Sequence, residues 1–213
     1  MIRVNSKSIF VLFAILFICS LAFADDGFDE SLSKARKLVE EKSYSAALDA
    51  YARINERLRK DPGLVIEWAR VYTYADKHAE AIKLFEEIRL AYPQRSAEII
   101  RELADQYKWN SQVPKAINVY KEGLVLKVED LQIFLGLAEA LFLNDQKNES
   151  LQIYDAALLR WPDNQQALLG KANVLSFADK LEESYALYQK VLDQDPGNLN
   201  ALNSQARILV WQG

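Results

Sequence analysis

The chain has 213 residues, of which 50% are hydrophobic and 26% are charged, a composition typical of a folded globular protein and not of a disordered one. Its formal net charge of −4 lacks the excess of basic residues that nucleic-acid binding favours, so we expect no nucleic-acid partner. Seven glycines and five prolines are few for an all-β protein and suit long helices joined by short turns.

The first 24 residues have the pattern of a secretory signal peptide. Arg3 and Lys7 precede an uncharged, largely apolar run that ends in Ala22-Phe23-Ala24, with small residues at the two positions that a signal peptidase reads. The run over residues 9–24 is shorter than the roughly 20 residues needed to span a bilayer. We therefore expect cleavage after Ala24 and no membrane span in the mature chain, with an uncleaved anchor as the alternative.

The predicted mature chain covers residues 25–213 and is periplasmic or secreted. Cleavage removes two cations and no anions, so the net charge becomes −6. It also removes Cys19, the only cysteine, and therefore any disulfide, thiol nucleophile or cysteine metal ligand. Cys19 follows Ile18 where a lipoprotein signal has a small residue, which argues against lipidation.

Six alanines recur at intervals of 34 or 35 residues along the mature chain. Each is followed after three residues by a large side chain, and each of the first five is followed after twelve residues by a small side chain and after sixteen by an aromatic ring. The alanines are Ala35, Ala69, Ala104, Ala138, Ala172 and Ala206, and the rings are Tyr51, Phe85, Tyr120, Tyr154 and Tyr188. Residues three and four apart share a helix face, so the pattern predicts two helices per repeat that touch at their small residues.

Prolines punctuate the repeats at the positions where a connecting turn is expected. Pro93, Pro162 and Pro196 each lie eight residues beyond an aromatic ring, and a proline there cannot continue the helix. In the first repeat the proline comes three residues later, at Pro62, so we expect that connection to be shifted. Asp61 before Pro62 fits an N-cap followed by proline at the first helical position.

This pattern resembles the tetratricopeptide repeat, a 34-residue helix–turn–helix unit. The resemblance implies an all-α, right-handed superhelical solenoid of about five and a half antiparallel helix pairs with a long concave groove. We number the repeats 1 to 6, near residues 28–61, 62–96, 97–130, 131–164, 165–198 and, in part, 199–213.

The chain departs from the family pattern at several positions. The glycine that follows the first helix of the family unit is missing from most repeats, and Ser150 and Ser184 replace the second small residue, usually alanine. Val128 stands where proline is usual. Gly123 lies inside the second helix of repeat 3, where we expect it to weaken the helix by about 1 kcal/mol relative to alanine.

The residues one position after each repeat alanine form one column, and those five positions after it form a second. A helix turns by 100° per residue, so both columns face away from the buried stripe of the first helices. The first column is polar: Arg36, Arg70, Asp105, Glu139, Asn173 and Arg207. The second is mostly aromatic: Glu40, Tyr74, Trp109, Leu143, Phe177 and Trp211. The resemblance implies that this face lines the groove. The predicted binding residues are Arg70, Tyr74, Arg101, Asp105, Lys108, Trp109, Glu139, Phe142, Asn173, Phe177, Arg207 and Trp211.

The aromatic residues of this face have two interpretations. They fill space between neighbouring first helices, since large rings are usually partly buried, or they contact a ligand. Rings offer rigid contact area at low entropic cost, which suits an extended peptide or a partner helix. They also stack on sugar rings, so direct binding of a polysaccharide or of a small ligand is the alternative.

Nothing in the sequence points to catalysis, a cofactor or a metal site. His78 is the only histidine, and no second histidine or cysteine of the mature chain completes a metal site or a nucleophile–base pair. Carboxylate pairs such as Glu40-Glu41 lie on exposed helical stretches, and no glycine-rich phosphate loop is present. We therefore expect a protein that is not an enzyme.

The leading hypothesis is an exported scaffold that binds a protein partner in its groove. Such arrays resemble the periplasmic helical regions of bacterial exopolysaccharide and cellulose secretion systems, and the short string over residues 206–213 looks like their repeats. The last helix, around Ala206, has no following partner helix. This favours a longer protein with a further C-terminal domain, or association through the uncapped helix.

Overall fold

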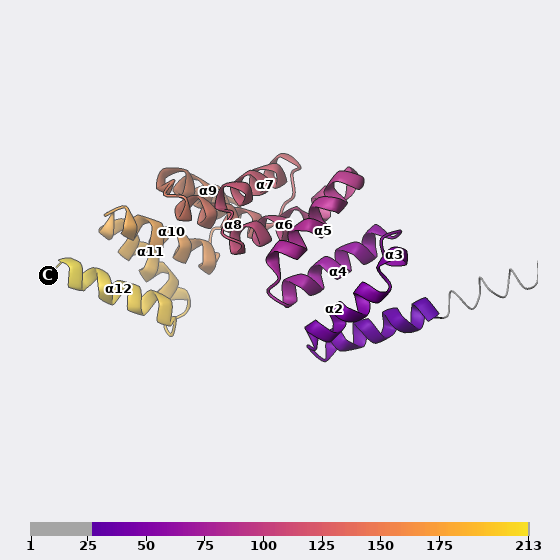
Figure 1. Ribbon diagram of the computed structural model, residues 1–213. Coiled ribbons are helices and arrows are strands. Elements are labelled where there is room, and N and C mark those ends of the chain that lie inside the picture. Colours follow the sequence, from indigo (N-terminus) through magenta and orange to yellow (C-terminus); the bar gives the residue numbers. More distant parts are fainter. Residues whose placement is uncertain (1–26, 213) are drawn as a thin grey trace, which may run out of the picture. The chain divides into compact units, whose positions relative to one another are not determined.

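The computed structural model describes residues 27–212, with side chains as far as residue 210. All regular structure in this range is helical (Figure 1). The predicted signal peptide and Gly213 lie outside the described residues. A first helix covers residues 27–40. It is followed by α2 (Tyr44–Arg53), α3 (Asn55–Leu58), α4 (Pro62–Tyr74), α5 (His78–Ala91), the 3-10 turn η1 (Pro93–Arg95), α6 (Ser96–Trp109), α7 (Val113–Val125), α8 (Leu131–Leu143), α9 (Lys147–Arg160), α10 (Gln165–Phe177), α11 (Leu181–Gln194) and α12 (Leu199–Gln212).

The helices follow the predicted two-per-repeat order, which confirms the fold class. Repeats 3, 4 and 5 are the pairs α6–α7, α8–α9 and α10–α11, and each pair packs against the next. The chain forms two compact units, of which the first ends at Ile88 and the second begins at Arg89. The candidate groove described below lies within the second compact unit.

The repeat alanines mark the helix crossings, as the sequence predicted. The first five are fully buried, and so are the rings of Tyr51, Phe85, Tyr120 and Tyr188. In α10 the alanine sits in a buried triad, Leu168, Ala172 and Leu175. Helix α12 repeats the same triad as Leu202, Ala206 and Leu209, and there all three residues are exposed.

The two serines that replace the second small residue are explained by hydrogen bonds. The Ser150 hydroxyl donates to the Ala138 carbonyl over 2.7 Å, and the Ser184 hydroxyl donates to the Ala172 carbonyl over the same distance. Both serines are fully buried. Each hydroxyl therefore gains a partner in the opposite helix of its own repeat, so burying it leaves no unpaired polar group.

The turns between paired helices keep the glycine conformation without glycine. Lys42, Asp76, Ser111, Asp145 and Asp179 stand at the glycine position, with φ between 54° and 60°. After α4, for example, Lys77 N donates to Tyr72 O and Asp76 N to Thr73 O, the hydrogen-bond pattern of a Schellman motif. The side chains that replace glycine therefore occupy a left-handed conformation that disfavours them.

Repeat 1 is irregular where the proline is displaced. Its second helix breaks between α2 and the single turn α3. Helix α4 then starts as predicted, with Pro62 at its first position and the Asp61 carboxylate accepting a hydrogen bond from Gly63 N over 2.7 Å.

Gly123 has a packing role that its helix propensity did not reveal. Helix α7 runs through it without a break. A Cβ at this position would lie 3.1 Å from Ile133 Cδ1 and 3.3 Å from Ile100 Cγ2. The glycine therefore lets the isoleucines of α6 and α8 approach the α7 backbone.

Candidate binding groove

The outward aromatic column is exposed in both compact units. Tyr74 and Trp109 are each 52% exposed and Phe177 is 57% exposed, while Phe142 beside them is half-buried. Tyr74 lies 5.8 Å from Tyr44 between ring centres, and Phe142 lies 5.3 Å from Phe177. Some of these rings therefore contact a neighbouring helix and still present a face to solvent.

A pocket of about 470 Å³ opens between α8 and α10, the first helices of repeats 4 and 5. It combines apolar and polar side chains, and its one charged residue is Glu139. The lining residues are Gln132, Leu135, Glu139, Phe142, Leu143, Tyr154, Gln166, Leu169, Gly170, Asn173 and Val174. Mixed linings of this kind, apolar with a few placed polar groups, are typical of ligand sites.

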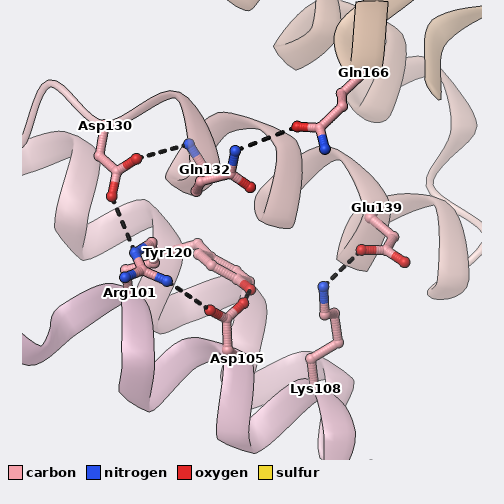
Figure 2. A network of polar contacts seen from close by, with 8 residues as sticks. All are labelled: Arg101, Asp105, Lys108, Tyr120, Asp130, Gln132, Glu139 and Gln166. Atoms are coloured by element: carbon pink, nitrogen blue, oxygen red, sulfur yellow. Dashed lines mark hydrogen bonds and ion pairs between the residues drawn. The ribbon is translucent and has the colours of Figure 1, made fainter. Parts of the chain in front are cut away.

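Charged side chains fill the neighbouring stretch of the groove, between α6 and α8 (Figure 2). Arg101 bridges two carboxylates, with Nη1 lying 3.3 Å from Asp105 Oδ2 and Nε 3.0 Å from Asp130 Oδ2. Lys108 Nζ lies 2.6 Å from Glu139 Oε2. These ion pairs, two within repeat 3 and one from repeat 3 to repeat 4, satisfy the charges internally, so this stretch is less available to a ligand than the pocket.

A tyrosine hydroxyl from the core reaches this face in repeats 1, 3, 4 and 5. The Tyr51 hydroxyl donates to Glu67 over 2.5 Å, the Tyr120 hydroxyl donates to Asp105, and the Tyr188 hydroxyl donates to Asn173 over 2.5 Å. Tyr154 is the exception. Its residue is only 6% exposed and lines the pocket, and its hydroxyl has no hydrogen-bond partner among the described residues.

A glycine in the next first helix seats two of these rings. An added Cβ at Gly136 would lie 2.5 Å from Tyr120 Cζ, and one at Gly170 would lie 2.4 Å from the Tyr154 hydroxyl oxygen. Atoms that are not bonded do not approach so closely, so only glycine fits. We call these contacts the Tyr120 junction (Tyr120 with Gly136) and the Tyr154 junction (Tyr154 with Gly170).

The two carboxylates bonded to tyrosines have opposite pKa shifts. Burial raises the pKa of Asp105, and the Tyr120 hydrogen bond and nearby cations only partly offset it. Burial also disfavours the charged form of Glu67, but hydrogen bonds from Arg36 and Tyr51 outweigh burial and lower its pKa. The reason is geometric, because Arg36 approaches Glu67 with two nitrogens, at 2.8 and 2.7 Å.

The structure brings some of the predicted residues together and separates others. Glu139, Phe142 and Asn173 line the pocket, and Phe177 touches Phe142 at its edge. The charged network beside it contains Arg101, Asp105 and Lys108. Four predicted residues lie outside both groups, namely Arg70 and Tyr74 in the first compact unit and Trp109 and Arg207 in the second. The Trp211 side chain lies outside the described part of the chain.

Sequence reasoning missed Gln132, Gln166 and Tyr154. The two glutamines lie at the same repeat position, 34 residues apart, and Gln132 Nε2 donates to Gln166 Oε1 over 3.3 Å. Tyr154 was treated as a core ring only. A usable signal was present: Gly136 and Gly170 interrupt good helix-forming sequence at matching repeat positions, which indicates a close approach from outside the helix.

Across residues 27–210, no group of three or more His, Cys, Asp or Glu side chains is arranged to hold a metal ion. No helix within the described chain has the length and apolar character needed to cross a membrane.

Neither a scan of family models nor a search of curated proteins gave a match to this sequence. Solved structures do match. A tetratricopeptide-repeat protein from Parabacteroides merdae ATCC 43184 is 17% identical over 87% of this chain and 73% of its own, with a TM-score of 0.75. YrrB, a tetratricopeptide-repeat protein with an unusual peptide-binding site, is 17% identical over 88% of this chain and 97% of its own, with a TM-score of 0.71.

A third match is the first tetratricopeptide-repeat domain of Spaghetti (RPAP3), solved with the HSP90 peptide SRMEEVD. It is 20% identical over 55% of this chain and 94% of its own, with a TM-score of 0.52. At these identities the likeness concerns the fold. The chain has the tetratricopeptide-repeat fold, as its alanine pattern indicated.

Proposed function

We propose that this protein is an exported, non-catalytic scaffold that binds a segment of a partner protein in the pocket between α8 and α10. The pocket carries the proposal, since it is open, spans two repeats and offers apolar surface beside amide and hydroxyl groups. Two proteins of the same fold are described with peptides or a peptide-binding site, which supports a protein ligand over other classes.

The chemistry of the lining supports binding rather than catalysis. Glu139 is the one ionisable carboxylate among the lining residues, and it is already paired with Lys108. General acid–base catalysis needs a proton donor and acceptor at the same reacting centre, and nucleophilic catalysis needs an activated nucleophile. Amide and aliphatic side chains instead match the surface of a polypeptide.

The test is selection from a phage-displayed library of random peptides against residues 25–213. Leu143 is 58% exposed in the pocket, and Leu159 is 82% exposed on α9 outside it. Selected peptides should bind wild type and Leu159→Asp equally well but bind Leu143→Asp at least tenfold more weakly, because a charge then faces their apolar side chains. The proposal would be refuted if the selected peptides bound both variants as tightly as wild type. It would also be refuted if no peptide were selected and an oligosaccharide bound wild type but not Leu143→Asp.

The proposed setting is the periplasm or the extracellular space, in an envelope or polysaccharide-secretion assembly. The predicted signal sequence and the resemblance of residues 206–213 to such assemblies support it. Amino-terminal sequencing of the protein from its native host should begin at Asp25. Deleting the gene should lower secreted polysaccharide while leaving its synthesis inside the cell intact, and an unprocessed amino terminus would contradict export.

A further inference from the structure

We infer that the α8–α10 pocket holds an internal, extended stretch of a partner by its main chain, takes an aliphatic side chain, and rejects acidic segments and free C-terminal carboxylates. This inference rests on the proposed function and narrows the ligand class. It follows from the Tyr154 hydroxyl, which has no partner among the described residues, from the arrangement of the amides and from the sign of the exposed charge.

Tyr154 is a buried residue whose hydroxyl has no hydrogen-bond partner among the described residues. The equivalent hydroxyls of Tyr51, Tyr120 and Tyr188 each donate to a carboxylate or amide oxygen. The Tyr154 hydroxyl instead faces the pocket that its residue lines. Burial, and then the negative charge of Glu139, raise the pKa of Tyr154, so the hydroxyl keeps its proton. A ligand with a carbonyl oxygen at this point supplies the missing acceptor.

The amides around the pocket add both donors and acceptors. Asn173 Oδ1 accepts from Tyr188, and Gln166 Oε1 accepts from Gln132, which leaves the NH₂ groups of Asn173 and Gln166 to donate. The Gln132 oxygen remains as an acceptor. An extended main chain presents carbonyl oxygens and N–H groups in alternation, so it can pair with both kinds of group. A sugar chain without amides matches fewer of them.

The pocket also has apolar lining side chains. Leu135 comes from α8, and Leu169 and Val174 come from α10. Gly170 also lines the pocket, and the Tyr154 hydroxyl occupies the place where a Cβ of Gly170 would lie. This surface suits one aliphatic side chain of a peptide whose main chain lies along the amides.

The charge exposed in the pocket is negative. In the Lys108–Glu139 pair the lysine side chain is 11% exposed and the glutamate side chain is 54% exposed, so the ligand meets the carboxylate. Arg101, the nearby arginine of the network, is held between Asp105 and Asp130. An acidic residue or a terminal carboxylate placed here would meet a like charge with no uncommitted cation among the pocket-lining residues, whereas a basic residue would be favoured.

The ligand class is tested with random 12-residue peptides displayed in two formats, one flanked on both sides by linker and one ending in a free carboxylate. We expect the flanked format to yield peptides with an aliphatic residue near a lysine or arginine, and without Asp or Glu. Selection of acidic peptides, or of the free-carboxylate format alone, would overturn the inference.

The hydroxyl is tested with Tyr154→Phe, which removes one oxygen atom, and with Tyr120→Phe as the matched control. Synthetic versions of the selected peptides should bind Tyr154→Phe about three- to tenfold more weakly than wild type, as loss of one hydrogen bond predicts. They should bind Tyr120→Phe as they bind wild type. Equal affinity for wild type and Tyr154→Phe would overturn the role of the hydroxyl.

Main-chain recognition has its own test. Replacing one peptide amide by an ester weakens the preceding carbonyl as an acceptor. An ester at one position of the peptide should weaken binding to wild type but weaken binding to Tyr154→Phe less. The reason is that the peptide carbonyl oxygen at that position and the Tyr154 hydroxyl form a single hydrogen bond, which the variant has already lost. Additive effects at every ester position would contradict that bond. If Leu143→Asp weakens the binding of no peptide in either format, the proposed function itself fails. That outcome differs from peptides whose affinity falls in Leu143→Asp but is unchanged in Tyr154→Phe, which would overturn only the role of the hydroxyl.

Discussion

The Tyr120 and Tyr154 junctions are built from the same parts and end in different chemistry. Each places a core tyrosine against a glycine in the first helix of the next repeat. The Tyr120 hydroxyl donates a hydrogen bond to Asp105, which belongs to a network of ion pairs, whereas the Tyr154 hydroxyl faces a pocket. A repeat architecture thus keeps its packing constant while one polar neighbour decides whether a junction is closed or available to a ligand.

The largest expected effect is the loss of stability in Gly136→Ala, because the new Cβ would overlap a Tyr120 ring that is fully buried and hydrogen-bonded. We expect the free energy of unfolding in urea to fall by about 2–3 kcal/mol. Gly170→Ala should lower it less, by about 1–2 kcal/mol, because Tyr154 can shift toward the pocket. Equal losses would show that the two rings are held equally firmly.

The Tyr120 hydroxyl should matter for stability and not for binding, and the Tyr154 hydroxyl should matter for binding and not for stability. Tyr120→Phe removes the tyrosine donor of Asp105, which keeps only Arg101 among the described residues, and we expect unfolding to require about 1–2 kcal/mol less free energy. Tyr154→Phe removes no internal hydrogen bond, so its change should stay within about 0.5 kcal/mol. Thermal or urea unfolding of the two variants checks this, and a large loss in Tyr154→Phe would mean that its hydroxyl has a partner inside the protein.

The pH dependence of stability sharpens the same contrast at the carboxylates. The pKa of Asp105 is raised, so its contribution is full below the ordinary aspartate pKa and is lost as pH rises through the folded-state value. Relative to Asp105→Asn, wild type should therefore lose stability as the pH rises above the ordinary aspartate pKa. An asparagine already accepts from the tyrosine in repeat 5, as Asn173, which makes this a conservative change.

Glu67 in the first compact unit should behave in reverse. Its pKa is lowered, so its contribution is present above the ordinary glutamate pKa and is lost as pH falls through the folded-state value. Relative to Glu67→Gln, wild type should gain stability as pH rises. Unfolding free energies measured at several pH values for both pairs test the two signs, and the same slope in both would contradict the assigned causes.

The smallest effect is expected at the turns, which are alike in the two repeats. Ser111 and Asp145 hold φ angles of 59° and 57° where glycine is unstrained. Ser111→Gly and Asp145→Gly should each raise the free energy of unfolding by about 0.5–1 kcal/mol, with the smaller gain at Asp145, because aspartate tolerates this conformation better. A loss in either variant would place the strain elsewhere.

The helix pairs were predictable from sequence because a crossing of two helices accepts only a small side chain. Six alanines at one spacing therefore fixed the register, and the outward columns followed from the helical turn of 100° per residue. The polar end of Tyr154 was not predictable in the same way. Whether a tyrosine hydroxyl finds a partner depends on the side chain at one position of its own repeat, which is Asp105 in repeat 3 and Glu139, paired with Lys108, in repeat 4. The periodic pattern predicts only the features that all repeats have in common, whereas the pocket at the Tyr154 junction depends on residues that differ between repeats.

The packing of each helix against its close neighbours in sequence also bears on how the chain folds. Helix pairs such as α8–α9 and α8–α10 join segments within about one repeat of each other. Closing loops of that length carries a small entropic penalty, and contacts of low sequence separation form quickly. A nascent chain can therefore complete each repeat and stack it on the previous one while synthesis continues, so the amino-terminal repeats need not wait for α12 to exist.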